Sequence, residues 1–154
     1  MKFSKNILLF VFFLSIKSVL FAQSHPDDIV GYYLVVDPFS EAVSQVHIYN
    51  AGNGSYEAIL IWVEDEEGKG YEGLVFLKEM TFNAKEKEWQ NAVITYPGKS
   101  GKFKAAMRFE KDGRLRIRAY WGVSMLGKTL HWKREKESRN PKIQPKKKFN
   151  YGRI

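Results

Sequence analysis

The chain of 154 residues contains no cysteine, and this absence excludes several kinds of chemistry. Without cysteine there is no disulfide, no thiolate metal site, no cysteine nucleophile and no lipid-modified N-terminal cysteine. Histidine is also scarce: His25, His47 and His131 lie far apart, outside any His-x-His or His-Glu-x-x-His spacing. The sequence therefore predicts no metal site.

Catalytic and cofactor-binding motifs are missing as well. Ser124 lies in the stretch GVSMLG, which lacks the Gly-x-Ser-x-Gly spacing and the strand–turn–helix context of a nucleophile elbow. No glycine-rich phosphate loop precedes a helix. The acidic run at 64–67 is typical of a solvated turn. We expect a protein that is not an enzyme and that uses no cofactor.

The first 22 residues have the layout of a signal peptide. A short basic start, with Lys2 and Lys5, precedes a continuous apolar run at 7–16. This run is too short to span a bilayer, which needs about 20 apolar residues. Cleavage after Ala22 would release a chain that begins at Gln23. The sequence thus predicts an exported protein, periplasmic or extracellular; an uncleaved anchor is the alternative.

The net charge of +8 is concentrated at the two ends of the chain. Residues 1–22 hold three lysines and no acidic residue, and residues 133–154 hold nine basic residues against two acidic ones, which leaves −2 for residues 23–132. A folded domain without a basic face does not suit nucleic acid. We predict one domain over 23–134 and a disordered basic tail over 135–154. This tail is either simply solvated or adheres to an anionic envelope surface through Lys146, Lys147 and Lys148.

Eight short runs rich in β-branched and aromatic residues alternate with turn residues. They lie at 29–36, 43–49, 55–63, 71–80, 88–96, 102–110, 114–121 and 128–134. No segment shows a helical period of apolar residues. Connections of seven residues or fewer favour antiparallel pairing of consecutive strands, because parallel strands need long crossovers. The sequence predicts a closed eight-stranded antiparallel up-and-down barrel, as in lipocalins and streptavidin, with a β-sandwich as the alternative.

The sixth and seventh runs allow their pairing register to be predicted. A three-residue loop at 111–113 places Phe109 opposite Leu115 and Phe103 opposite Trp121, so that all apolar side chains share one face. A two-residue turn would place apolar side chains opposite basic ones. We therefore predict a type I turn followed by Gly113 in the left-handed conformation.

The same reasoning, extended to the last hairpin, predicts that Ala119 faces Leu130 and that Ile117 faces Trp132. Residues 122–127 then form a loop at the mouth of the barrel. This loop could plug the barrel, line a ligand entrance, or dock on a partner. Three of its residues are strongly apolar, namely Val123, Met125 and Leu126.

Two classes of function fit this pattern. The first is a non-catalytic binding module for an apolar or amphipathic small molecule. The second is an envelope interaction or structural protein whose barrel is filled with side chains; the sequence predicts no oligomeric state. For the first class, the candidate ligand-binding residues are Tyr33, Phe103, Met107, Trp121 and Trp132 inside the barrel, with Val123, Met125 and Leu126 in the loop.

Several of these stretches resemble a secreted bacterial family known as domain of unknown function 2147. The similarity covers roughly residues 29–134 and is most specific in LRIRAYWGVSMLGKTLHWKR, at 115–134. The matching positions are Gly31, Gly73, Leu74, Trp89, Ile94, Tyr96, Pro97, Arg118, Tyr120, Gly122, Ser124, Gly127, Thr129 and Trp132. Tyr33 replaces the tryptophan usual near the start, and Asn91 replaces a usual glycine. The resemblance implies export and a lipocalin-like barrel, and it implies no particular reaction.

Overall fold

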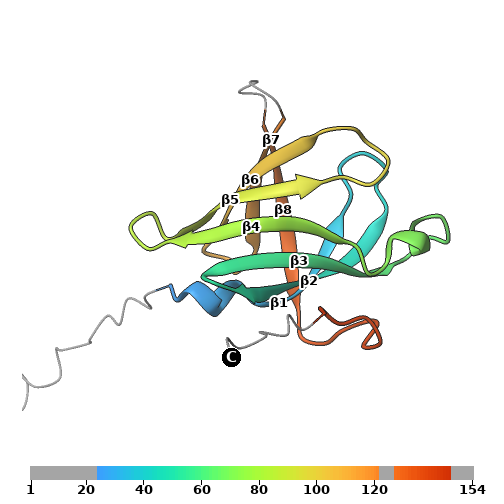
Figure 1. The fold of residues 1–154 in the computed structure, drawn as a ribbon, viewed down its shortest axis with the longest axis horizontal. Coiled ribbons are helices and arrows are strands. Elements are labelled where there is room, and N and C mark those ends of the chain that lie inside the picture. Colours follow the sequence, from blue (N-terminus) through green and yellow to red (C-terminus); the bar gives the residue numbers. More distant parts are fainter. Residues whose placement is uncertain (1–23, 122–126, 147–154) are drawn as a thin grey trace, which may run out of the picture.

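The alternating apolar and polar runs form antiparallel strands that close into a barrel (Figure 1). The computed structural model describes residues 24–121 and 127–146. Its strands are β1 (Gly31–Val36), β2 (Val43–Gly52), β3 (Ser55–Val63), β4 (Val75–Asn83), β5 (Glu88–Thr95), β6 (Lys102–Phe109), β7 (Leu115–Trp121) and β8 (Lys128–Glu135). Two short 3-10 helices accompany them, η1 (Pro26–Ile29) and η2 (Gly68–Tyr71). The predicted signal peptide lies outside the described residues.

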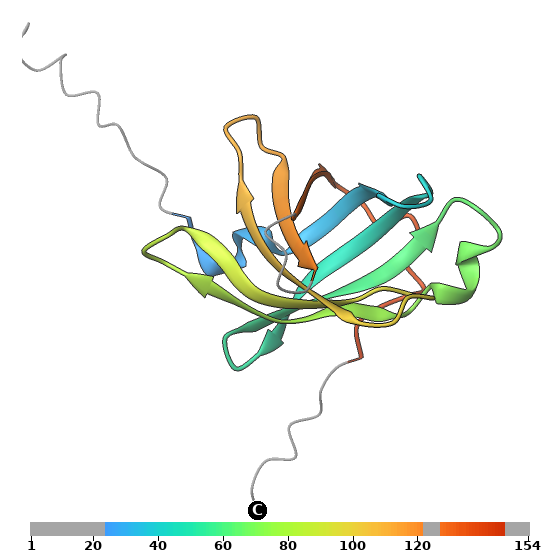
Figure 2. The same cartoon turned by 90° about the horizontal axis from the view of Figure 1, so that it is seen from above.

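The barrel is closed by the pairing of its first and last strands. Each strand pairs with the next one in the chain, and β8 pairs with β1 through Tyr32 opposite Glu135 and Leu34 opposite Lys133. Closure removes the free sheet edges that an open sheet would expose. Figure 2 shows the strands crossing around a common interior. The predicted eight-stranded up-and-down barrel is confirmed, and the sandwich alternative is not needed.

The β6–β7 hairpin has the predicted register. Phe109 pairs with Leu115 and Phe103 pairs with Trp121. Gly113 has a φ of 83°, and its amide donates to the Glu110 carbonyl at 3.0 Å. The buried apolar face and the requirement for a left-handed residue therefore determine this turn together.

The register predicted for the β7–β8 hairpin is wrong by two residues. Ile117 pairs with Leu130 rather than with Trp132, which instead pairs with Leu115. A shift of two residues leaves every side chain on the same face of the sheet, because the side-chain period of a strand is two. The apolar pattern could therefore not distinguish the two registers.

One end of the barrel is closed by η1. The Trp89 indole Nε1 donates to the Pro26 carbonyl at 2.9 Å, and the Tyr33 hydroxyl donates to the Ile29 carbonyl at 2.7 Å. Ile29 itself is fully buried in the core. Arg134 in β8 donates to the Val30 carbonyl at 3.1 Å and to the Tyr33 hydroxyl at 2.7 Å. These bonds hold the N-terminal segment across this closed end.

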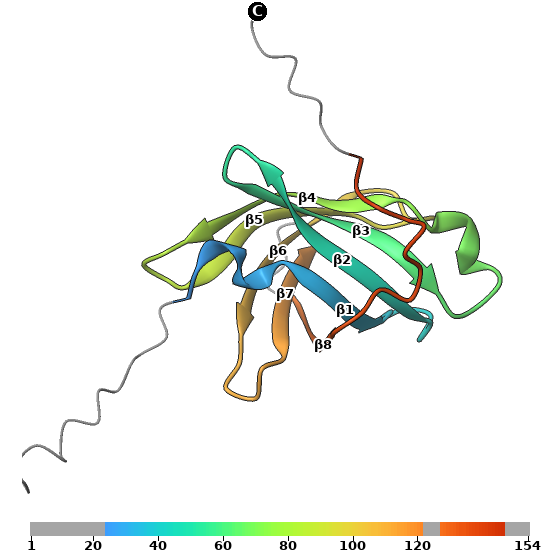
Figure 3. The same ribbon diagram turned by 90° about the horizontal axis from the view of Figure 1, so that it is seen from below.

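The chain after β8 lies against the outside of the barrel. The side-chain amide of the fully buried Gln45 donates to the Glu135 carboxylate at 2.6 Å and to the Glu137 carbonyl at 2.9 Å, and accepts from the Arg139 amide at 2.7 Å. The Arg139 guanidinium also lies 4.7 Å from the centroid of a Trp62 ring. Figure 3 shows this segment passing along β2 and β3.

This arrangement differs from the prediction of a disordered tail from residue 135 onward. Composition gave a low apolar content for the tail, but it could not show that a buried amide on β2 binds the backbone of 137–139. Of the predicted surface-binding lysines, Lys146 is exposed, while Lys147 and Lys148 lie outside the described residues.

Candidate ligand-binding site

The half of the barrel next to η1 is filled with side chains. Trp89 and Met107 are fully buried there, and the Trp89 ring packs 4.8 Å from Phe82 and 5.6 Å from Phe109, centroid to centroid. Large aromatic rings contribute most to such a core because each removes a large apolar area from water. This half therefore provides stability and a rigid base for the other half.

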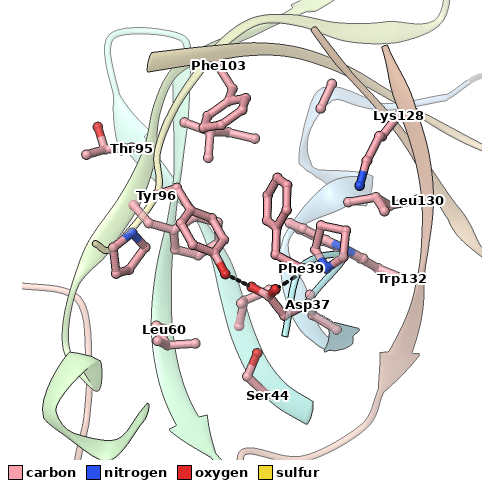
Figure 4. A pocket seen from close by; sticks show the side chains of 17 residues that line it. Asp37, Phe39, Ser44, Leu60, Thr95, Tyr96, Phe103, Lys128, Leu130 and Trp132 are labelled. Carbon is pink, nitrogen blue, oxygen red and sulfur yellow. Dashed lines mark hydrogen bonds between the residues drawn. The ribbon is translucent and has the colours of Figure 1, made fainter. Parts of the chain in front are cut away.

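The opposite half of the barrel encloses an apolar cavity of about 270 Å³ (Figure 4). This volume lies close to the lower end of small-molecule sites, about 300 Å³. Each of the eight strands contributes to the cavity wall, and so do the turns that follow β1 and β5. The lining residues are Val35, Asp37, Pro38, Phe39, Ser44, Val46, Leu60, Phe76, Ile94, Thr95, Tyr96, Pro97, Phe103, Ala119, Lys128, Leu130 and Trp132.

Two turns meet across the mouth of this cavity. Asp37 directly follows β1, and its carboxylate accepts from the backbone amides of Phe39 at 2.7 Å and Ser40 at 2.8 Å. The same carboxylate accepts a short hydrogen bond from the Tyr96 hydroxyl, which lies directly after β5 (Figure 4). The Phe39 ring stands edge-on to Tyr96 with a centroid separation of 5.2 Å. These contacts join the β1–β2 turn to the β5–β6 turn.

The hydrogen bonds at the mouth fix the protonation states of both partners. Burial alone would raise the pKa of the Asp37 carboxyl, but the hydrogen bonds from Tyr96, Ser40 and Phe39 outweigh burial and lower it. Burial, together with the Asp37 carboxylate, raises the pKa of the Tyr96 hydroxyl above its usual value. At neutral pH the tyrosine is therefore the donor and the aspartate the charged acceptor.

Trp132 separates the cavity from the filled half. Its ring lines the cavity and lies 6.4 Å from the rings of both Tyr33 and Phe76. Only 3% of Trp132 is exposed, and its Nε1–H has no hydrogen-bond acceptor among the residues that the structure describes. A buried donor without an acceptor costs about 1–3 kcal/mol.

The sequence predicted part of this site. Of the predicted ligand-binding residues, Phe103 and Trp132 line the cavity, whereas Tyr33 and Met107 do not. Both are inward-facing, but the Tyr33 hydroxyl binds η1 and Met107 packs in the filled half. Alternation along a strand shows which side chains point inward and gives no information about their height in the barrel.

The remaining predicted site residues could not be compared with the cavity. The side chain of Trp121 and the loop residues Val123, Met125 and Leu126 lie outside what the structure describes.

Sequence reasoning missed Phe39, Tyr96 and Lys128 as site residues. Phe39 follows Asp37-Pro38 and Tyr96 precedes Pro97-Gly98, and both dipeptides were interpreted only as strand ends. The sequence feature that could have identified Phe39 and Tyr96 is an aromatic residue next to a turn, at the end of the barrel where the cavity opens.

Other kinds of site find no support in the described part of the chain. Within residues 24–121 and 127–146, no three His, Asp or Glu side chains are placed to hold a metal ion. The helices described there are also too short to cross a membrane.

The fold and its cavity place the chain among lipocalin-like barrels. A similar solved structure is protein HP1028 from Helicobacter pylori, described as belonging to the lipocalin family. It shares 17% identity with this chain at a TM-score of 0.60, over 71% of this chain and 84% of that one.

The family itself is shown by sequence. The model of an uncharacterised protein family conserved in bacteria, DUF2147, matches residues 31–134, and the chain belongs to this family. A search of curated proteins gave no match.

Proposed function

We propose that this protein is an exported, non-catalytic binding module that holds a small apolar or amphipathic molecule in the cavity opposite η1. The observation that carries the proposal is the cavity itself, about 270 Å³ lined mostly by apolar side chains. Small-molecule sites combine such a lining with a few placed polar groups. Here Asp37, Tyr96 and Lys128 stand at one end of the cavity.

A purely structural barrel would gain stability by filling this space. Protein interiors are close-packed, and a void forfeits the dispersion contacts of the side chains around it. Among the described residues, side chains fill the half of the barrel near Trp89 in this way, and they do not fill the half near Leu130. The contrast within one barrel supports ligand binding over the filled-barrel alternative.

A cavity-filling variant tests the proposal. Ala119 lines the cavity, so Ala119→Phe places an aromatic ring in the space that a ligand would occupy. Ala106, on the neighbouring strand, alternates with the inward Ala105 and Met107 and therefore faces outward, which makes Ala106→Phe the matched control.

Binding of 1-aminonaphthalene, an apolar fluorophore that is uncharged at neutral pH and small enough for the cavity, is followed by its fluorescence. We expect wild type and Ala106→Phe to bind the dye and Ala119→Phe to lose at least tenfold in affinity. Circular dichroism checks that both variants are folded. Equal dye binding by a folded Ala119→Phe variant would contradict the proposed site.

Export and surface binding form the second part of the proposal. The basic and apolar start of the chain supports cleavage near Gln23, and the lysines at 146–148 support adhesion to an anionic envelope surface. Mass spectrometry of protein from the envelope fraction should give a mature N-terminus near Gln23; an intact Met1 there would contradict export.

Truncation after Pro145 should weaken binding to anionic vesicles at low salt, and unchanged binding would rule out this role for the lysines.

A further inference from the structure

Two lysines stand over one aromatic ring at the mouth of the cavity. The ammonium nitrogen of Lys99, in the β5–β6 turn, lies 3.9 Å from the centroid of the Phe39 ring, and that of Lys128, the first residue of β8, lies 4.6 Å from it. Lys128 and Phe39 both line the cavity, and Figure 4 shows the Lys128 ammonium directed towards the Phe39 ring. Segments far apart in the chain thus bring two positive charges together at this mouth.

Neither ammonium has a carboxylate partner within 4.0 Å in the part of the chain that the structure describes. The one acidic group in the cavity wall, Asp37, already accepts hydrogen bonds from Phe39, Ser40 and Tyr96. The aromatic ring attracts the two exposed cations only weakly. Two positive charges on one ring, with no carboxylate within 4.0 Å of either among the described residues, favour the approach of an anion.

We propose that the ligand is a small amphipathic monocarboxylate whose carboxylate lies between Lys99 and Lys128 and whose apolar part enters the cavity towards Leu130. This inference rests on the proposed function and names the chemical class of the ligand. A charge-assisted hydrogen bond to each ammonium holds the carboxylate at the rim, where part of it stays in water. The apolar part leaves water completely.

The volume of the cavity limits the size of this ligand. An engineered protein cavity of about 150 Å³ holds benzene. A cavity of about 270 Å³ therefore accepts an apolar part of roughly six to ten carbon atoms. Octanoate fits this range, and 1-octanol provides the same chain with an uncharged head.

Comparison of these two compounds tests the inference by isothermal titration calorimetry. Wild type is compared with Lys99→Gln, Lys128→Gln and the double variant, and Lys102→Gln is the control because this exposed lysine, at the start of β6, does not line the cavity. We expect the double variant to lose at least tenfold in octanoate affinity and less than twofold in octanol affinity. Raising the salt concentration should weaken only octanoate binding.

The outcomes separate this inference from the function on which it rests. If wild type binds both compounds and the double variant weakens both equally or neither, the lysines do not select an anion and the inference is wrong. If wild type binds neither compound, the proposed function fails as well. Thermal melting of each variant confirms that the lysine substitutions leave the barrel folded.

Discussion

At the scale of single residues, a few polar side chains join segments that are distant in the chain. Gln45 is the clearest example, because this fully buried residue makes side-chain hydrogen bonds to Glu135, at the end of β8, and to the segment that follows. A buried polar side chain stabilises the fold only while its hydrogen-bond partners are present. Without them, it has lost its hydrogen bonds to water and has gained none from the protein.

Replacing Gln45 by alanine should therefore destabilise the protein. The change leaves the Glu137 carbonyl and the Arg139 amide without their partner, and we expect the free energy of unfolding to fall by about 1–3 kcal/mol. Urea unfolding measures the loss. Gln144→Ala is the control, because Gln144 is an exposed glutamine of the same segment and should cost less than about 0.5 kcal/mol. Equal midpoints for both variants would contradict this role of Gln45.

The bond between Tyr96 and Asp37 makes stability depend on pH. Because the pKa of Asp37 is lower in the folded than in the unfolded chain, its contribution is present above the unfolded pKa of about 3.9 and is lost as pH falls through the folded pKa. Tyr96→Phe should lower stability by about 1–2 kcal/mol at pH 7 and by less at pH 3.

Thermal melting across pH 3–7 measures this difference, and NMR titration of the Asp37 carboxyl should show a higher pKa in the variant. Tyr71→Phe, at an exposed tyrosine, is the control and should melt as wild type does at every pH. A loss in Tyr96→Phe that does not change with pH would show that the hydroxyl stabilises the fold without acting through Asp37.

At the scale of elements, turn chemistry and strand alternation determine most of the barrel. Strands β3 and β6 occur nearly where the sequence predicted them, and the β6–β7 register follows from Gly113 and one apolar face. The strand predicted at 71–80 begins only at Val75, because residues 68–71 form η2. The alternation of apolar and polar residues does not show where a short helix takes the place of the first residues of a predicted strand.

Gly113 provides a test of turn geometry with little steric complication. Nothing lies within 4 Å of a Cβ built there, so any cost of substitution comes from its φ of 83°. Gly113→Val should lower the free energy of unfolding by about 1 kcal/mol or more, because a β-branched residue tolerates this conformation poorly. Gly113→Asn should cost less, since asparagine adopts left-handed conformations more readily. Equal urea midpoints for the two variants would contradict this account.

The segment after β8 belongs to the fold as far as Asn140, whose side-chain amide donates to the Glu72 carboxylate at 3.3 Å. Removing residues 136–154 takes away the hydrogen bonds to Gln45 and the contact of Arg139 with Trp62, and we expect a loss of about 2 kcal/mol or more. Removing only 147–154 is the control and should change stability by less than about 0.5 kcal/mol. If both truncations melt like the full chain, the segment does not support the barrel.

At the scale of the whole molecule, the described residues fill one half of the barrel and leave the other half hollow. The filled half is closed by η1, and the hollow half ends in turns that carry Asp37, Phe39, Tyr96 and Lys99. Sequence alone predicted the barrel and two residues of the cavity wall. It could not predict the cavity, because volume depends on the height of each side chain in the barrel and on how distant turns meet.

The most direct test of the central claim is native mass spectrometry of the protein purified from its own cells. We predict that wild type carries a retained small molecule, or gains one on incubation with octanoate, and that the cavity-filling variant Ala119→Phe carries neither. A wild-type protein that stays at the mass of the bare chain, even with an excess of octanoate or octanol, would contradict the claim that this barrel is a binding module.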